Sequence, residues 1–197
     1  MLVSEAARGE NEPVVGVTAS IAASADGSGV VTQEIVLDQL RRAEGLYAPF
    51  GVHFRLVENR TLPNSKADLV TPKDRDALAS FCERGVINVM FVASLRDIDV
   101  TEEVYRMGVT WTGPGARYVI VASAARETTL AHELGHFFGL QHVKTKNNLM
   151  SYDRDGGPVF LDADQKRAVL GNARALVQTR SLTLESWASP NAGALEI

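Results

Sequence analysis

The chain has 197 residues, of which 45% are hydrophobic and 22% charged, and its formal net charge is −4. This length and composition predict one globular domain whose core needs no disulfide support, and the single cysteine, Cys82, excludes an internal disulfide framework. No basic cluster of the kind that binds nucleic acid occurs, and the longest apolar run, residues 86–95, is too short to cross a membrane.

The two ends of the chain differ from its middle. Residues 1–12 contain several polar residues and no apolar segment of the kind that a signal peptide requires, so we expect a mobile lead-in and no signal peptide. Residues 13–180 carry the periodic patterns of a single domain, and residues 181–197 are expected to form a polar tail. The localisation is therefore unknown. Three alternatives stay open: export by another route, a leader before these residues, and a place inside the cell.

The first part of the domain predicts a strand, a helix and a second strand. Residues 14–23 are rich in Val, Ile, Thr and Ala, which favours a strand. Thr32 can cap a helix that stops before Pro49. The apolar face of that helix consists of Val36, Leu40, Ala43 and Tyr47. Residues 51–59 alternate between apolar and polar side chains, which predicts a half-buried strand with His53 on its surface.

Apart from the helix of residues 129–142, described below, the rest of the sequence predicts two more helices and three more strands. A loop over residues 60–69 leads to a helix that Thr71 caps and Gly85 ends. A last helix begins at Asp162, where Gln165 completes a capping box. The predicted strands are a nearly continuous apolar run and two shorter segments, at residues 86–95, 107–112 and 117–123.

Three of the four histidines lie in residues 129–142, in the pattern H-E-x-x-H-x-x-G-x-x-H. His132 and His136 are four residues apart, so a helix places both on one face, where two imidazole nitrogens can bind one metal ion. Zinc is the metal that such nitrogen ligands usually hold. Glu133, next to the first histidine, is the expected general base beside the metal.

The remainder of the motif supplies a third ligand. Gly139 can adopt the left-handed conformation that ends a helix and turns the chain, which lets His142 return to the metal. Three protein ligands leave one position for water, as in a catalytic zinc site. A buried helix with ordinary core histidines is the alternative, but such a helix has no use for Glu133 or for a third histidine after a glycine turn. We therefore expect one catalytic zinc ion.

The extended motif, followed eight residues after His142 by Met150, resembles that of the metzincin clan of zinc endopeptidases. The resemblance implies that Met150 lies in a turn beneath the metal, the Met-turn. The short spacing is similar to that of the matrixins, and Tyr152 is placed like a tyrosine that can contact the zinc in serralysins and astacins. Asn147 and the residues after it are more like the pappalysin-type branch, so the branch stays unresolved. For Tyr152, a role at the zinc and plain packing both stay open.

The resemblance implies an α+β fold with α/β/α layers. A twisted, mostly parallel sheet with an antiparallel edge strand would accompany a backing helix and the active-site helix, in an N-terminal subdomain that ends near residue 139. A small C-terminal subdomain would hold the Met-turn and the terminal helix. Substrate would pair with the edge strand, for which residues 107–112 or 111–115 are candidates, and residues 151–160 would form the pocket wall.

The resemblance also implies an activity, which is hydrolysis of peptide bonds by a zinc-activated water with Glu133 as general base. The expected partners are a peptide or protein substrate and a protein inhibitor, without nucleic acid or a membrane span, and the expected state is a monomer. The clan also implies secretion, although the chain shows no signal peptide. Two alternatives stay open: a zinc exopeptidase or small-amide hydrolase, and a toxin-like or binding module with incidental peptidase activity.

Overall fold

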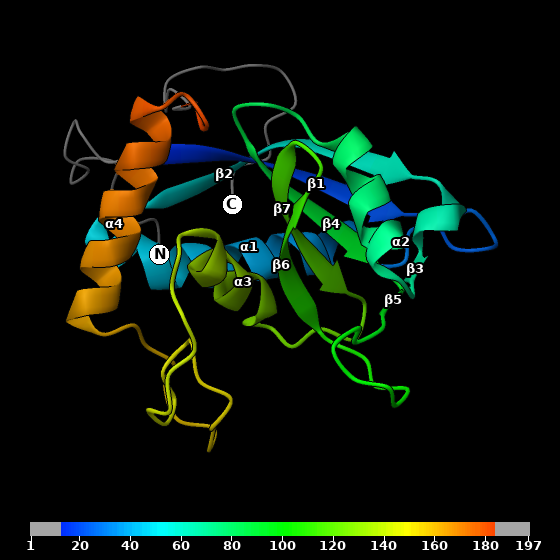
Figure 1. The fold of residues 1–197 in the computed structure, drawn as a ribbon. Helices are drawn as coiled ribbons and strands as arrows, with labels where there is room; N and C mark the ends of the chain where they lie inside the picture. The colour runs from blue at the N-terminus through cyan, green and yellow to red at the C-terminus, as the bar shows by residue number, and fades with distance from the viewer. Residues whose placement is uncertain (1–12, 184–197) are drawn as a thin grey trace.

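A computed structural model of the chain describes residues 13–183 (Figure 1). The expected lead-in, residues 1–12, and residues 184–197 of the expected tail lie outside the described residues. In the described part of the tail, Leu182 is buried and forms a parallel bridge with Gly85. No helix in the described part of the chain is long and apolar enough to span a membrane.

Five strands form the main sheet: β1 (Val14–Ala22), β2 (His53–Leu62), β4 (Ile87–Val92), β6 (Gly108–Gly113) and β7 (Ala116–Ala122). Their order across the sheet is β2-β1-β4-β7-β6. The first four run parallel, and β6 pairs antiparallel with β7 at the edge. This confirms the predicted mostly parallel sheet with one antiparallel edge strand. A second, two-stranded sheet pairs β3 (Asp68–Leu69) with β5 (Ser94–Leu95).

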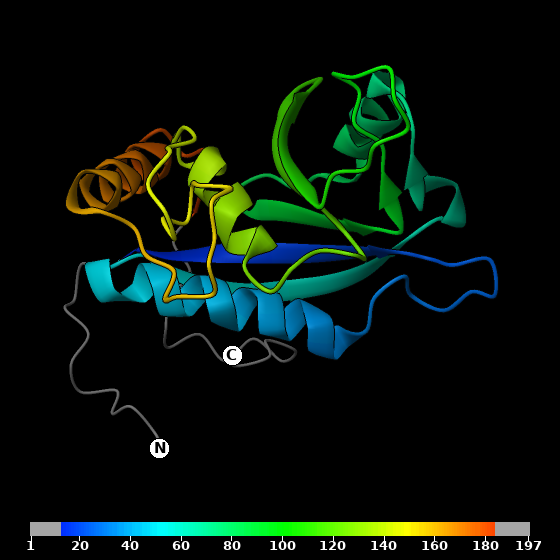
Figure 2. The same cartoon turned by 90° about the horizontal axis from the view of Figure 1, so that it is seen from below.

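Four α-helices and three short 3-10 helices complete the described chain. The α-helices are α1 (Gln33–Tyr47), α2 (Pro72–Asp76), α3 (Thr129–Phe137) and α4 (Ala163–Gln178). The 3-10 helices are η2 (Ala48–Phe50), η3 (Asn64–Lys66) and η4 (Ala77–Phe81). Figure 2 shows α1 and α3 on one face of the sheet, with α2 and η4 on the other. The predicted layers and the backing helix beside the motif helix are therefore confirmed.

Two cores form because the side chains of the central strands alternate between the two faces of the sheet. On β4, Val89 and Phe91 pack into the core shared with α1 and α3. Met90 and Val92 point the other way, into the core beneath η4 and the small sheet. Each fully buried side chain of this size contributes about 1.5–3 kcal/mol to stability, so a strand buried on both faces anchors the fold.

The strand β2 corrects two predictions. It runs to Leu62, beyond the predicted end at residue 59, because β1 pairs with it along its whole length. The segment 60–69 is therefore not a single loop. His53, predicted to lie on the surface, is only 4% exposed. The end of α1 lies beside the start of β2, and Glu44 Oε1 accepts a hydrogen bond from His53 Nδ1 at 2.7 Å.

The helix after Thr71 is shorter than predicted. The predicted cap is confirmed, since the Thr71 hydroxyl accepts from the Asp74 amide at 3.2 Å and Asp74 Oδ2 accepts from the Thr71 amide at 2.7 Å. The α-helix nevertheless ends at Asp76 and continues as the 3-10 helix η4. Only Leu78 of η4 is fully buried, so little packing is available to hold a longer α-helix.

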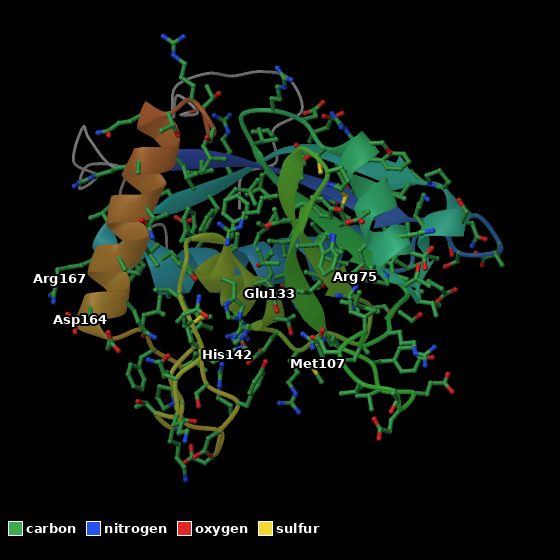
Figure 3. All side chains as sticks on the ribbon, in the orientation of Figure 1. Arg75, Met107, Glu133, His142, Asp164 and Arg167 are labelled. Carbon is green, nitrogen blue, oxygen red and sulfur yellow. The ribbon has the colours of Figure 1, made fainter. Side chains whose placement is uncertain are left out.

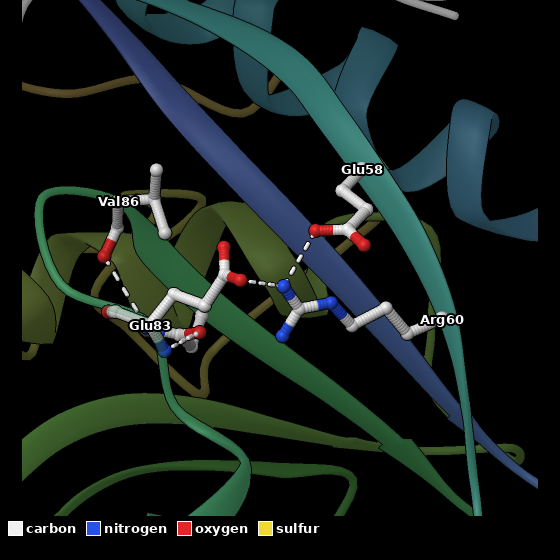
Figure 4. Close-up of polar contacts among 5 residues, drawn as sticks. Glu58, Arg60, Glu83 and Val86 are labelled. Carbon is white, nitrogen blue, oxygen red and sulfur yellow. Dashed lines mark hydrogen bonds and ion pairs between the residues drawn. The ribbon is translucent and has the colours of Figure 1, made fainter.

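A polar cluster links β2 to the start of β4 across the sheet (Figure 4). Arg60 of β2 pairs with Glu58 on the same strand at 2.6 Å and with Glu83, which precedes β4. The buried side chain of Asn88 accepts from the Glu83 amide and donates to the carbonyls of Glu83 and Val86. Asn88 therefore satisfies its polar atoms inside an otherwise apolar strand. The exposed ion pairs add little stability.

Candidate metal centre

The backing helix α1 fixes the start of α3. Thr128 provides no side-chain cap, and the buried Gln39 of α1 replaces it. Its Oε1 accepts from the Leu130 amide at 3.0 Å, and its Nε2 donates to the Arg126 carbonyl at 2.8 Å. Tyr47, also on α1, donates its hydroxyl to the Ala131 carbonyl at 2.9 Å. These contacts hold the first turn of the motif helix rigidly against α1.

The three motif histidines converge. His132 and His136 lie one turn apart on α3, and His142 returns after Gly139, whose φ of 90° confirms the expected left-handed turn. The Nε2 atom of His142 lies 3.2 Å from that of His132 and 3.0 Å from that of His136. A tetrahedral zinc ion with Zn–N bonds of about 2.0 Å places its nitrogen ligands roughly 3.3 Å apart. The histidine cluster therefore fits a metal ion of this kind.

Backbone carbonyls orient two of the rings. His132 Nδ1 lies 2.7 Å from the Leu149 carbonyl, and His136 Nδ1 lies 2.8 Å from the Leu140 carbonyl. A carbonyl only accepts, so each Nδ1 carries the hydrogen and each Nε2 lone pair faces the cluster. Burial lowers the pKa of His132 to about 4 and also lowers the pKa of His136 and His142. The rings are thus neutral at pH 7, as metal ligation requires.

The end of α3 is held from two directions. Asn172 of α4 donates to the Phe138 carbonyl at 2.7 Å, and a side chain on Gly139 would approach Asn172 to 3.1 Å. From the sheet, Arg117 of β7 donates to the His136 carbonyl at 2.7 Å. The first bond satisfies a carbonyl at the helix end, and the second adds to the bond that the His136 carbonyl accepts from the Gly139 amide. They also fix the direction in which the chain leaves toward the third histidine.

Glu133 is buried between α3 and the edge strand β6. Its side chain lines the cleft, and burial raises its pKa to about 7. The Thr110 hydroxyl lies 2.5 Å from the Glu133 carbonyl and 3.3 Å from its Oε2. A β-carbon on Gly108 would lie 2.9 Å from Glu133 Cγ and 2.8 Å from Thr129 Cγ2. Glycine at this position is therefore what lets β6 approach so closely.

Met150 lies directly against the motif helix. It is fully buried, and a β-carbon on Gly135 would lie 2.5 Å from its sulfur atom. A tight turn holds it, because Ser151 N donates to the Asn148 carbonyl and Asn148 Oδ1 accepts from the Met150 amide, both at 2.9 Å. The Asn148 amide also pairs with Gln165 at the start of α4. This buried pair ties the turn to the terminal helix.

Tyr152 lies over the histidines from the solvent side. Its ring centroid is 4.6 Å from that of His142 and 6.0 Å from that of His132. Tyr152 is 77% exposed, so these ring contacts bury little of it. The structure thus brings together all six residues that the sequence singled out.

A cleft of about 700 Å³ opens over the three histidines. One side consists of β6 and the residue before it, through Met107, Gly108, Val109 and Thr110. This favours residues 107–112 over 111–115 as the candidate edge, since Trp111 instead donates its indole N–H to Asp76 on the other face. In Figure 3, Glu133, His142 and Met107 lie close together below β6. The segment after the turn contributes Ser151, Tyr152 and Arg154.

Two solved structures resemble this one in fold. The archaemetzincin from Methanopyrus kandleri has a TM-score of 0.57 at 16% sequence identity, over 88% of this chain and 99% of that one. Metalloproteinase-II from Bacteroides fragilis has a TM-score of 0.55 at 13% identity, over 82% of this chain and 53% of that one. The chain has the zincin fold of these metallopeptidases.

The likeness lies in the backbone more than in the sequence. No family model matches this chain, and no curated protein matches it. It spans about half the length of the Bacteroides protein and nearly all of the archaemetzincin. At these identities the comparison establishes the fold, and the chemistry must come from the side chains of the cleft.

Sequence reasoning missed several residues around the cleft. Gln39 and Thr110 position the motif helix and Glu133, but no local pattern distinguishes them from ordinary helix and strand residues. Arg106, Arg126 and Arg154 line the cleft and come from three separate segments. Only Arg154 falls in a segment with an expected role, the pocket wall at residues 151–160.

Proposed function

We propose that the chain is a zinc metallopeptidase in which His132, His136 and His142 hold one zinc ion. The observation that carries this proposal is the convergence of three Nε2 atoms, at 3.0 and 3.2 Å, in a cleft that also holds a buried carboxylate. The similarity in fold to two metallopeptidases supports it. When bound, zinc would supply Lewis-acid polarisation of the scissile carbonyl and acidify a water molecule.

Glu133 is the general base of the proposed reaction. Its carboxylate accepts a proton from the attacking water and then passes that proton to the leaving amine. The contacts of Thr110 to the Glu133 carbonyl and carboxylate, at 2.5 and 3.3 Å, keep this base in register with the edge strand. A peptide bound along that strand would therefore meet the carboxylate at a fixed position.

Two further residues support the reaction. Tyr152 donates a hydrogen bond to the carbonyl oxygen as negative charge develops on it. Its exposed ring, 4.6 Å from the ring of His142, has room to do so. Met150 acts as a Met-turn, because its side chain fills the space beneath the ligand helix next to Gly135.

The substrate is a peptide that adds to the sheet. The strand order ends at β6, which has no partner on its outer edge among the described residues. An extended peptide can pair with this edge through main-chain hydrogen bonds, which favours an endopeptidase. An exopeptidase is the second candidate, because Arg126 and Arg154 in the cleft could hold a terminal carboxylate.

A mixed peptide library tests the proposal. The purified protein, loaded with zinc, is incubated with the library with and without a chelator, and the cut sites are read by mass spectrometry. We expect internal cuts that the chelator abolishes and added zinc restores. Cuts confined to one or two residues from a terminus would indicate an exopeptidase rather than an endopeptidase. No cleavage by zinc-loaded protein would overturn peptidase activity altogether.

A further inference from the structure

Three arginines line the cleft, although the chain as a whole carries a formal net charge of −4. Arg106 is neutralised, because Asp97 pairs with it at 2.9 Å and Asp99 contacts the same guanidinium. Arg126 and Arg154 are different. Of the described carboxylates, none forms an ion pair with either side chain. The cleft therefore holds two guanidinium groups that no described carboxylate pairs with.

The two arginines without a carboxylate partner line the same cleft. Burial lowers the pKa of Arg154, and the positive charge of Arg126 lowers it further. Like charges that share a cleft repel each other, and a bound anion removes that cost. The pair is thus arranged to favour a negatively charged group of a ligand.

Arg154 is fixed beside the metal centre. Its Nη2 donates to the Leu149 carbonyl at 2.8 Å, and its Nε donates to the Ser151 carbonyl at 3.1 Å. The same Leu149 carbonyl lies 2.7 Å from His132 Nδ1. A guanidinium has five N–H donors, so these two bonds orient Arg154 and leave donors for a ligand.

Arg126 is held by its backbone rather than by its side chain. Gln39 of α1 donates to the Arg126 carbonyl at 2.8 Å, at the entrance to α3. The Arg126 side chain is exposed and lines the cleft. Its backbone is therefore fixed, and its guanidinium is free to contact a ligand in the cleft.

We propose that Arg126 and Arg154 bind a carboxylate of the peptide substrate next to the scissile bond. This rests on the proposed peptidase function and names its substrate class. Planar guanidinium groups bind carboxylates through paired, charge-assisted hydrogen bonds. The carboxylate comes either from an Asp or Glu side chain or from the C-terminus of the peptide.

Matched peptides test the proposal. A cleaved peptide is prepared with Glu or Gln at each position that flanks the cut, each with a free or an amidated C-terminus. We expect the carboxylate form to have a kcat/KM about tenfold higher at one position, as a charge-assisted pair provides. A lower kcat/KM for the Gln peptide than for the Glu peptide assigns the bound carboxylate to the side chain. A lower kcat/KM for the amidated peptide than for the free one assigns it to the C-terminus.

Variants locate the effect. Arg126→Gln should reduce the ratio of the two kcat/KM values to about twofold or less, and Arg126→Lys should retain part of it. Arg174→Gln, on the exposed side of α4, makes the same charge change away from the cleft and should leave the ratio at its wild-type value. An unchanged ratio in Arg126→Gln, or a wild-type ratio near one, would overturn the proposal while leaving peptidase activity intact.

Binding provides a readout that does not need turnover. The same peptide pairs are titrated by calorimetry into the zinc-loaded Glu133→Ala protein and into its Arg126→Gln derivative. The carboxylate peptide should bind about tenfold more tightly than its neutral partner, and the difference should fall with Arg126→Gln and with added salt. Equal binding of the two peptides would contradict the proposal even if no peptide is cleaved.

Discussion

Glu133 and Tyr152 lie beside the same histidines but are held in different ways. Glu133 is 6% exposed and contacts Thr110 on the edge strand, so its carboxylate has a fixed position. Tyr152 is 77% exposed, and its ring lies against the rings of His132 and His142. A change at Tyr152 therefore perturbs little packing and isolates the contribution of its hydroxyl.

Replacing Tyr152 by Phe removes only that hydroxyl. If it stabilises the developing oxyanion, kcat falls on the order of 100-fold, whereas KM changes little. Steady-state kinetics on one cleaved peptide measures both. Tyr105→Phe is the matched control, since its hydroxyl donates to Glu103 on an exposed loop. Unchanged kcat in Tyr152→Phe would leave this residue without a chemical role.

At the scale of elements, α1 is more than a backing helix. Its buried Gln39 caps α3, and its Tyr47 holds the same first turn through the Ala131 carbonyl. The helix that carries His132 and His136 is only nine residues long, so its geometry depends on these tertiary contacts more than on its own propensity.

Replacing Gln39 by Ala should lower the free energy of unfolding by about 1–3 kcal/mol, because the Leu130 amide and the Arg126 carbonyl both lose a buried partner. The zinc affinity should fall with it, since His132 lies in the first turn of α3. Urea unfolding and zinc titration measure the two effects. Gln178→Ala, at the exposed end of α4, should change neither.

The cap of α2 gives stability that depends on pH. Hydrogen bonds from the hydroxyl and then the amide of Thr71 lower the pKa of Asp74. Its contribution is therefore complete above the unfolded pKa of about 3.9 and is lost as the pH falls through the lower folded value. Asp74→Ala should lower the free energy of unfolding by about 1 kcal/mol at pH 7, and this loss should become smaller as the pH falls below about 3.9. In a Thr71→Ala background, Asp74→Ala should lower the free energy of unfolding at pH 7 by less. An equal loss in both backgrounds would show that the two residues do not form a cap.

At the scale of the whole molecule, the metal site joins the two parts of the chain. The motif helix supplies His132 and His136, and the segment after Gly139 supplies His142. The same segment is tied to α4 through the Asn148–Gln165 pair. A bound metal would therefore clamp the segments on either side of residue 139 together.

Removing the metal should destabilise the whole domain. A ligand present at 100 times its Kd stabilises the folded state by about 2.7 kcal/mol, which corresponds to a Tm shift of roughly 5–10 °C for a chain of this size. Calorimetry before and after chelation measures the shift, and added zinc should restore it. His53→Gln lies outside the cluster and should keep the chelator-dependent shift. An identical Tm with and without metal would contradict the clamp.

Much of the site could be predicted because its geometry is local. Four-residue spacing on a helix brings His132 and His136 together, and Gly139 makes the return of His142 possible within three residues. The orienting groups escaped prediction because they are backbone carbonyls, at Leu149 and Leu140, which have no sequence signature. Their partners become visible only when distant segments are packed.

The fold could be predicted in outline, whereas the ends of its strands and the burial of single residues could be predicted less well. The mostly parallel sheet, its antiparallel edge strand and the layers followed from the resemblance, whereas the extent of β2 depends on pairing with β1 and not on its own polar residues. His53 was predicted to lie on the surface because the alternation of apolar and polar residues indicates only which face of a strand a side chain is on. It does not indicate that Glu44 of α1 lies beside that face. The arginines of the cleft come together from separate loops, which no local pattern reveals.

The central claim is that Glu133 activates water at a zinc ion held by the three histidines. The most direct measurement compares zinc content and peptide cleavage in the wild type and in Glu133→Ala. Both proteins should bind about one zinc per chain, because the ligands are intact. The kcat of the variant should fall by at least about 100-fold, since it lacks the general base. A variant that binds zinc and still cleaves at the wild-type rate would contradict the claim.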